Sequence, residues 1–317
     1  MATYRHSLPQ LEGGFFVTDG GMETTFIFLD GLQLPHFASF VMLASEEGRD
    51  RLQAYYRRYL DIARRHGAGF ILDTPTWRAN ADWAGKLGYT REALHAANLG
   101  SVSLLAGLRG RYEQPGQPIV ISGAVGPRGD GYKAGNMDAS EAEDYHSVQI
   151  GSFAKSDADM VTAFTLTNID EAIGVARAAA ARSMPCAISF TLETDGRLVT
   201  GRSMQEAIET TDAATGGSPA YYMINCAHPT HFAEAFDPDA NWTKRIRGLR
   251  ANASRMSHAE LDESETLDAG DPVDLAQRYR QLMCRMPQVR IVGGCCGTDH
   301  RHVAAICAAC LPELTHA

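Results

Sequence analysis

Eight short apolar segments alternate along the chain with segments of helical spacing. The predicted strands are 15–18, 69–73, 119–122, 159–164, 186–191, 220–225, 246–251 and 289–292. Apolar runs of this length, separated by amphipathic helices, are typical of parallel strands buried on both faces. A closed (β/α)8 barrel of the TIM type and an open doubly wound sheet both fit this alternation. The Gly-x-Gly-x-x-Gly fingerprint of dinucleotide-binding sheets is absent, so we predict a (β/α)8 barrel.

Length and composition define the class of protein. A chain of 317 residues, 44% of them hydrophobic, can bury a large core, and no change of composition marks a linker. We therefore expect one domain over residues 1–317. The net charge is −9 and there is no basic run, which argues against binding to nucleic acid or to an anionic membrane surface. The chain has no run of 18 apolar residues, so no membrane span is predicted. Residues 1–6 lack the apolar core of a signal peptide, so we expect a cytoplasmic protein.

A pair of adjacent cysteines follows the last predicted strand. Cys295 and Cys296 lie between Gly294 and Gly297, and glycines permit the sharp turn that would bring both side chains to one target. Cys226 ends the sixth predicted strand and could supply a third sulfur. Three thiolates would suit a zinc ion with one open position, whereas the simpler alternative is that these are small apolar packing residues. A disulfide within the adjacent pair is disfavoured by its strain. An odd total of seven cysteines in a reducing compartment predicts thiols or metal ligands and not a disulfide framework.

Other candidate functional residues also follow predicted strands. Asp19, Gly20 and Gly21 come after the first strand, where Asp19 could orient a polar group and the glycines would let a ligand approach the backbone closely. Thr74 and Trp77 come after the second strand, and the Trp77 ring could face a cationic ligand, as could Phe40. The polar segment 252–270 is long enough for a functional loop or lid, or it is a solvated surface loop. Capping-box patterns are present at Ser140 with Glu143 and at Ser203 with Glu206.

These motifs resemble the zinc-dependent homocysteine S-methyltransferase family, which includes the betaine–homocysteine and S-methylmethionine–homocysteine methyltransferases. The similarity runs from about Phe15 to Cys310. It is carried by the stretches 293–298 (GGCCGT), 225–229 (NCAHP), 19–24 (DGGMET), 123–127 (GAVGP) and 145–149 (YHSVQ). The resemblance implies a (β/α)8 barrel with Zn2+ held by Cys226, Cys295 and Cys296. It also implies two small-molecule partners, a thiol acceptor such as homocysteine and a methyl donor. A homo-oligomer is compatible with the sequence.

The chemistry expected from this ligand set is methyl transfer to a metal-bound thiol. A free thiol has a pKa of about 8.5 and is mostly protonated at neutral pH, so coordination makes the nucleophilic thiolate available. Asp19 could orient the acceptor, and the Gly20–Gly21 amides could hold its carboxylate. His228 would close the fourth coordination position and is therefore not expected to be a ligand. The long C-terminal extension of betaine-dependent members is missing, so we expect a sulfonium donor more than a betaine-like one.

The chain departs from the family pattern after the fourth predicted strand. There the family carries a glutamate that binds the amino group of homocysteine, and Thr165 takes its place. A lost charge-assisted hydrogen bond costs roughly 1.5–3 kcal/mol. Homocysteine is still the first expectation, and the alternatives are another thiol or selenol acceptor, or demethylation of a sulfonium. Glu193 could replace the missing carboxylate. A further alternative is a non-catalytic barrel that binds zinc or a ligand.

Overall fold

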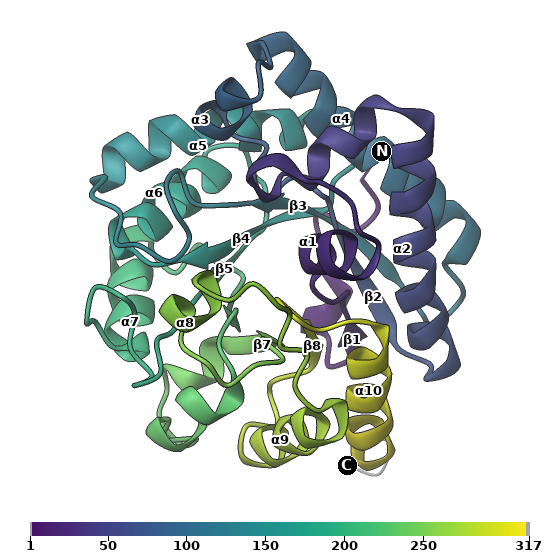
Figure 1. Ribbon diagram of the computed structural model, residues 1–317. Helices are drawn as coiled ribbons and strands as arrows, with labels where there is room; N and C mark the ends of the chain where they lie inside the picture. Colours follow the sequence, from purple (N-terminus) through teal and green to yellow (C-terminus); the bar gives the residue numbers. More distant parts are fainter. Residues whose placement is uncertain (1, 315–317) are drawn as a thin grey trace.

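Eight parallel strands close into a barrel in the computed structural model, which describes residues 2–314 and the side chains of residues 2–311. Each strand pairs with its neighbours in sequence, and β1 pairs with β8 through Phe16 with Ile291 and Val17 with Val292. Figure 1 looks along the barrel, with helices around the outside. The strands are β1 (Phe16–Val17), β2 (Gly69–Asp73), β3 (Ile119–Val125), β4 (Met160–Leu166), β5 (Cys186–Phe190), β6 (Tyr221–Asn225), β7 (Ile246–Ala251) and β8 (Ile291–Gly294). The predicted single-domain (β/α)8 barrel is confirmed.

Helices connect the strands at every crossover except one. The long helices are α2 (Glu46–Arg65), α4 (Arg91–Tyr112), α5 (Ala139–Ala154), α6 (Ile169–Ala180), α7 (Met204–Thr215), α9 (Pro272–Arg285) and α10 (His300–Leu314). Three short ones, α1 (Met22–Thr24), α3 (Ala81–Lys86) and α8 (His258–Asp262), lie within loops. Between β6 and β7 the chain forms only the 3-10 turns η5 (Pro229–His231), η6 (Ala233–Ala235) and η7 (Thr243–Arg245). Pro229 and Pro238 lie in this connection, and proline disfavours a continuous helix because it lacks a backbone N–H.

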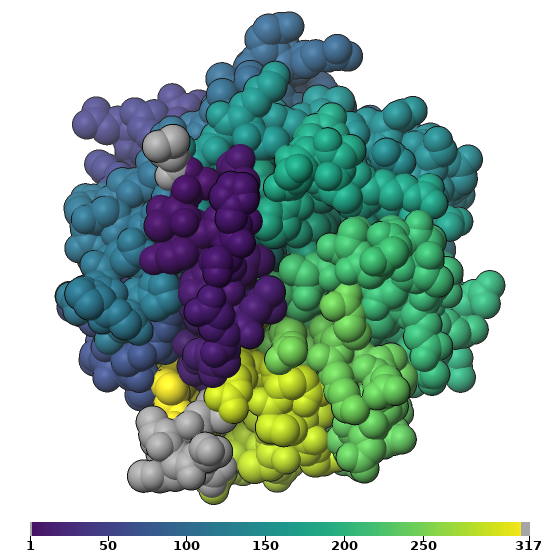
Figure 2. All heavy atoms as spheres, turned by 180° about the vertical axis from the view of Figure 1, so that it is seen from behind, coloured from purple at the N-terminus to yellow at the C-terminus, as the bar shows by residue number. Residues whose placement is uncertain are grey.

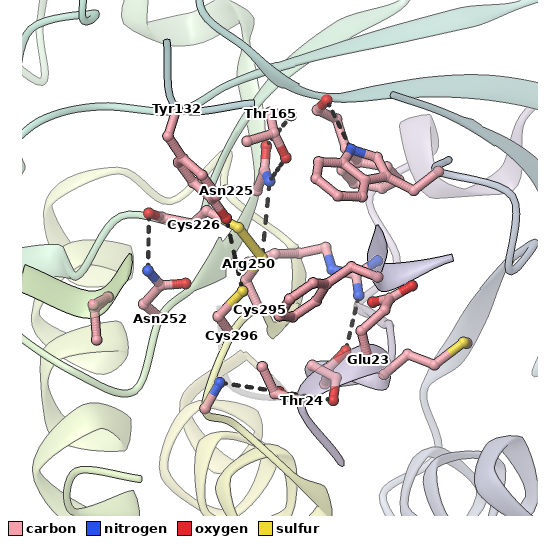
Figure 3. Close-up of a pocket in the computed structure, with 18 of the residues that line it drawn as sticks. Glu23, Thr24, Tyr132, Thr165, Asn225, Cys226, Arg250, Asn252, Cys295 and Cys296 are labelled. Carbon is pink, nitrogen blue, oxygen red and sulfur yellow. Dashed lines mark hydrogen bonds between the residues drawn. A yellow bond between two sulfur atoms is a disulfide. The ribbon is translucent and has the colours of Figure 1, made fainter. Parts of the chain in front are cut away.

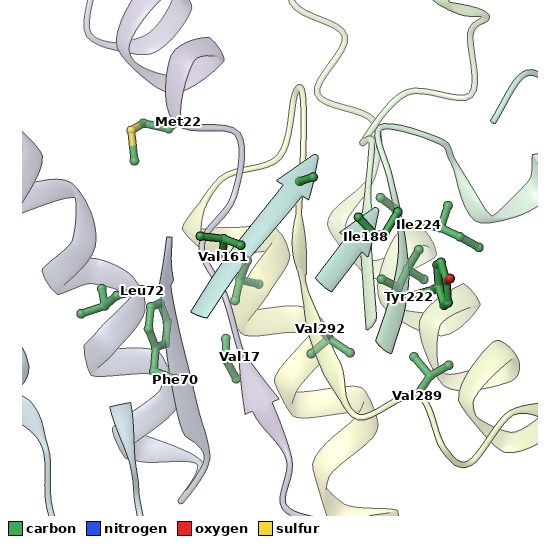
Figure 4. Close-up of a cluster of buried hydrophobic side chains, with 14 of the residues drawn as sticks. Val17, Met22, Phe70, Leu72, Val161, Ile188, Tyr222, Ile224, Val289 and Val292 are labelled. Atoms are coloured by element: carbon green, nitrogen blue, oxygen red, sulfur yellow. The ribbon is translucent and has the colours of Figure 1, made fainter. Parts of the chain in front are cut away.

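Two apolar clusters correspond to the two faces of the closed sheet. One contains Phe16, Ile71, Val120, Met160, Ala187, Tyr221, Met223 and Ile291, which come from nearly every strand and therefore meet inside the barrel. The alternate strand residues pack outward against the helices, and Figure 4 shows Val17, Phe70, Leu72, Val161 and Ile188 among them. These side chains thus fill the barrel interior toward the amino ends of the strands, and a cavity can form only toward the carboxyl ends.

The N-terminal segment covers the end of the barrel at which the strands begin (Figure 2). The backbone N–H groups of Thr3 and Tyr4 donate to the buried carboxylate of Asp159, each at 2.7 Å. The guanidinium of Arg5 donates to the Ala158 carbonyl, and Leu8 joins the inner apolar cluster. This end of the barrel is therefore closed by the chain itself.

The helix caps agree with the sequence prediction at one position and not at another. Ser203 and Glu206 form the predicted capping box of α7. The prediction of a box at Ser140 and Glu143 is wrong, because α5 begins one residue earlier, at Ala139. Its cap is the carboxylate of Asp138, which accepts from the N–H groups of Ser140 and Glu141 and satisfies two of the unpaired helix donors.

Among residues 2–314, no helix is both long enough and apolar enough to cross a lipid bilayer. This agrees with the predicted absence of a membrane span. The predicted cytoplasmic location stays a prediction.

Gly174 provides a test of the packing between α5 and α6. A Cβ atom at this position would lie 2.5 Å from the backbone nitrogen of Glu143, so the two helices would have to move apart. Gly174→Ala should lower the free energy of unfolding by about 1–3 kcal/mol, as overpacking does. The control is Gly107→Ala in α4, where no atom lies within 4 Å of the added methyl, and stability should rise by up to about 1 kcal/mol. Equal effects of the two substitutions in urea titrations would contradict this close contact.

Candidate metal centre and substrate pocket

A pocket of about 470 Å³ opens at the carboxyl ends of the strands. Its walls come from residues at or just after the ends of β1 to β4 and β6 to β8, which is where barrel enzymes place their chemistry. The segment 252–270 forms part of the mouth and contains α8. The segment therefore lines the pocket, and its role as a functional loop or lid stays a prediction.

Three sulfur atoms converge at the base of the pocket (Figure 3). The Sγ atoms of Cys226, Cys295 and Cys296 all lie within 4.8 Å of one another. Cys226 and Cys295 are joined as a disulfide, so the expectation that these cysteines are unpaired thiols does not hold for this state. The bond links the ends of β6 and β8 and is not the adjacent pair. Cys296 keeps a thiol, whose pKa is raised by burial.

The backbone after β8 turns as the glycine pattern predicted. The carbonyl of Cys295 accepts from the N–H of Thr298 at 3.1 Å and from its hydroxyl at 2.7 Å, which closes a four-residue turn. Gly297, the third residue of this turn, has φ of 78°, a conformation that glycine adopts without a steric penalty. The turn is therefore what points both cysteines into the pocket.

Cys226 has a positive φ of 55°, which costs a non-glycine residue about 1–3 kcal/mol. Its surroundings hold this conformation. The carbonyl oxygen of Cys226 accepts from Asn252 Nδ2 at 3.0 Å and from His258 Nε2 at 2.6 Å. The other ring nitrogen of His258 lies 3.1 Å from Glu193 Oε1, so the predicted substitute carboxylate supports His258 and does not line the pocket.

The three sulfurs fit a tetrahedral metal site once the disulfide is reduced by two electrons and two protons. Zinc–sulfur bonds of about 2.3 Å place neighbouring sulfurs about 3.8 Å apart, within the 4.8 Å spread of these atoms. Two polar groups lie next to the sulfurs: Asn225 Nδ2 is 3.9 Å from Cys295 Sγ, and the Tyr132 hydroxyl is 3.7 Å from Cys296 Sγ. Donors around thiolates stabilise their charge and orient them.

A buried arginine holds the two halves of the site together. Arg250 in β7 binds Asp19 Oδ1 at 2.5 Å and Asp73 Oδ2 at 2.7 Å, and its Nε donates to the Gly294 carbonyl at 3.0 Å. The second oxygen of Asp19 accepts from the Tyr55 hydroxyl at 3.0 Å. Asp19 thus lies in the pocket wall, with both oxygens already hydrogen-bonded inside the protein, and its predicted role in orienting the acceptor stays a prediction.

The remaining predicted substrate-binding residues also line the pocket. Thr165 has φ of 62°, and its hydroxyl accepts from Asn225 Nδ2 at 2.8 Å, so it contacts the residue that precedes Cys226. The Thr74 hydroxyl is used within the protein, accepting from the Ala124 N–H at 2.9 Å. The N–H of Gly21 donates to the Thr298 carbonyl at 3.0 Å, which leaves that amide engaged and not directed at a substrate carboxylate.

Two other candidates lie elsewhere. Phe40 does not line the pocket, because its ring packs edge-on against Tyr89 in a separate apolar cluster, at 5.0 Å between centroids. The expectation that it faces a cationic donor is therefore not supported by its position. His228 Nδ1 accepts from the Thr230 N–H, and His228 is not among the clustered ligand atoms, in agreement with the prediction that it is not a ligand.

A protein-family model described as homocysteine S-methyltransferase matches residues 16–310. The chain belongs to the homocysteine S-methyltransferase family. It is therefore a methyltransferase, as the sequence motifs predicted.

Solved structures of one homocysteine methyltransferase share the fold of this chain. The oxidized form of the Escherichia coli enzyme MmuM has a TM-score of 0.75 and 21% sequence identity, over 96% of this chain and 99% of the other. The metallated form of MmuM has a TM-score of 0.73 and 20% identity, over 96% and 98% of the two chains. At this identity the likeness shows the barrel fold. No curated protein sequence matches this chain.

Several pocket residues of this family member were not found from the sequence. They are Glu23, Asp73, Arg78, Tyr132, Asn225, Arg250 and His258. Arg250 could have been found from the sequence, because a charged residue within a buried apolar strand indicates that an oppositely charged partner is buried beside it. Tyr132 and His258 lie inside loops, where no periodicity indicates which side chains turn inward.

The Arg250 guanidinium, which Asp19 and Asp73 share, predicts an unusual pH dependence of the free energy of unfolding. The pKa of Asp73 is raised to about 7, because burial outweighs the attraction of Arg250 and because Asp19 adds a second negative charge. The folded state thus holds this proton more tightly than the unfolded chain does. The stability contributed by Asp73 is complete below pH 4 and is lost as the pH rises through about 7.

The comparison of wild type with Asp73→Asn isolates this effect. The free energy of unfolding of wild type, minus that of the variant, should fall by roughly 2–4 kcal/mol between pH 4 and pH 8. Urea unfolding at several pH values measures it. A difference that does not change with pH would show that the pKa of Asp73 is not raised.

Proposed function

We propose that the protein is a zinc-dependent S-methyltransferase that moves a methyl group from a small sulfonium or betaine-like donor to homocysteine and so forms methionine. The observation that carries this proposal is the convergence of Cys226, Cys295 and Cys296 at the base of a pocket in a member of this family. MmuM, whose fold this chain shares, has been solved in a metallated form, which supports a metal-dependent reaction here.

The three cysteinates would hold the metal and leave one position open toward the pocket. With the acceptor at that position, the metal would supply a positive charge that lowers the pKa of the acceptor thiol, so that its sulfur reacts as a thiolate at neutral pH. The acceptor sulfur then forms a bond to the methyl carbon while the bond from that carbon to the donor breaks. The electron pair of the broken bond stays on the donor, which loses its positive charge. The thiol proton leaves to solvent, so the reaction needs no separate general base.

The other pocket residues orient the reactants and restrict water. Asn225 and the Tyr132 hydroxyl lie beside the sulfurs of Cys295 and Cys296. Phe164 and Trp77 give the pocket an aromatic wall, and such a wall suits a cationic donor. Arg250 does not contact a substrate in this account. It fixes the Gly294 carbonyl, and with it the turn that carries two of the ligands.

The direct test offers homocysteine to the reduced, zinc-loaded protein with S-methylmethionine, S-adenosylmethionine or betaine in separate reactions. Zinc-dependent formation of methionine, read by mass spectrometry, is the expected result with one of these donors. Cys296→Ser should reduce the rate by at least about 100-fold, because even groups that only support a ligand cost 10–100-fold when removed. The matched control is Cys284→Ser, an exposed cysteine in α9, which should leave the rate unchanged.

The identity of the acceptor must be checked, because Thr165 stands where the family carries the glutamate that binds the amino group of homocysteine. If the protein binds about one zinc per chain but forms no methionine from any donor, homocysteine is excluded and other thiols and selenols are to be screened. Full activity of Cys296→Ser would contradict the proposed metal centre.

A further inference from the structure

Arg78, a buried arginine in the pocket wall, has no carboxylate partner in the described part of the chain. It is 9% exposed and lines the pocket beside Trp77. Among residues 2–311, its only hydrogen bond runs from Nη1 to the Gly129 carbonyl, at 3.0 Å. Its Nε is buried without any acceptor. A buried charge with unpaired donors is unfavourable, so this arrangement predicts an anion that the protein itself does not supply.

Two aromatic rings pack against the Arg78 guanidinium. The Trp77 ring lies 4.0 Å and the Trp83 ring 3.9 Å from the guanidinium carbon. A guanidinium packed against aromatic rings binds a ligand through its N–H groups, which lie in its own plane. The edge formed by Nε and Nη2 makes no hydrogen bond within residues 2–311, and two parallel N–H groups match the two oxygens of a carboxylate.

Glu23 places an opposite charge in the same pocket. It is half-buried, and its Oε1 accepts from the Ser39 hydroxyl at 2.7 Å, while no cation pairs with it among the described residues. Its position relative to the metal ligands is fixed by the next residue, because the Thr24 hydroxyl accepts from the Gly297 N–H at 3.2 Å. The α1 turn is thus docked on the loop that carries Cys296, with the Glu23 side chain toward the cavity (Figure 3).

Glu23 and Arg78 are close enough for their charges to interact. The pKa of Arg78 is lowered by burial, and Asp130, Tyr132 and Glu23 oppose that effect. The pKa of Glu23 is raised by burial, and a bound ammonium group would lower it again. Glu23 and Arg78 thus bring opposite charges into the pocket that holds the three sulfurs, and neither has an ion-pair partner within residues 2–311.

We propose that Glu23 and Arg78 form a binding site for the head group of an α-amino acid, in which Glu23 binds the ammonium and Arg78 binds the carboxylate. The inference rests on the proposed function and names the residues that bind the head group of its substrate. It also accounts for Thr165, since the charge absent there is supplied from α1 instead. Both a thiol amino acid and an amino-acid sulfonium donor carry this head group.

A binding experiment tests this site without metal or turnover. The reduced, metal-free protein is titrated with L-methionine, with 3-(methylthio)propylamine, which lacks the carboxylate, and with 4-(methylthio)butanoate, which lacks the amino group. Fluorescence of Trp77 and Trp83, which flank Arg78, reports the binding. L-Methionine should bind about 10-fold or more tightly than either truncated compound, because each lacks one charge-assisted hydrogen bond.

Single substitutions assign the two charges. Arg78→Gln should weaken L-methionine and the butanoate by about 10-fold or more and leave the amine unchanged. Glu23→Gln should weaken L-methionine and the amine and leave the butanoate unchanged. The exposed Arg202→Gln is the control and should change none of them. Thermal unfolding of each variant checks that the fold is retained.

The outcomes separate this site from the reaction. Equal binding of the three compounds, no binding of L-methionine, or an equal loss of all three in both variants would overturn the head-group site. In the methyl-transfer assay, a raised KM of Arg78→Gln for homocysteine alone places the site on the acceptor, and a raised KM for S-methylmethionine alone places it on the donor. Either result supports the site. A lack of turnover with every thiol would overturn the proposed function, whereas the binding result would still decide the head-group site.

Discussion

One buried arginine links the two strand ends that precede the candidate metal ligands. The backbone carbonyl of Arg250 accepts from the Cys226 N–H at 3.0 Å, and its side chain donates to the carbonyl of Gly294, the residue before Cys295. Its guanidinium is fixed in turn by Asp19 and Asp73 at the ends of β1 and β2. Removing one partner of such a buried charge network typically costs about 3–5 kcal/mol. The Arg250 network therefore positions the strand ends that carry the sulfurs. Other pocket residues take no part in this network and remain available to bind substrate.

Backbone strain is concentrated in the same region. Cys226 and Thr165, at the ends of β6 and β4, both have positive φ, which is uncommon for residues other than glycine. Asn225 bonds to both the N–H and the hydroxyl of Thr165, while Asn252 and His258 hold the Cys226 carbonyl. Strain of this kind persists where many contacts enforce it, and such places are commonly functional. Despite this strain, Cys226 lines the cavity together with Cys295 and Cys296.

The sequence predicted the barrel and its sulfurs because both depend on local patterns. Buried parallel strands are continuous apolar runs, and a glycine-flanked cysteine pair at a strand end is a compact signal. The charges that complete the pocket come from contacts between distant segments. Arg250 binds Asp19, 231 positions away. Arg78 packs against two tryptophans, one of them in α3, which carried no periodic signal. Gly21 shows the same limit, since its amide is used by Thr298 from the far end of the chain.

The most direct measurement of the central claim is zinc K-edge X-ray absorption on the reduced, zinc-loaded protein, before and after addition of a thiol acceptor. The account predicts three sulfur neighbours at about 2.3 Å and one lighter ligand, changing to four sulfurs when the acceptor binds. A zinc ion with fewer than three sulfur neighbours, or a spectrum that the thiol does not change, would contradict the assignment of Cys226, Cys295 and Cys296 as an open metal site.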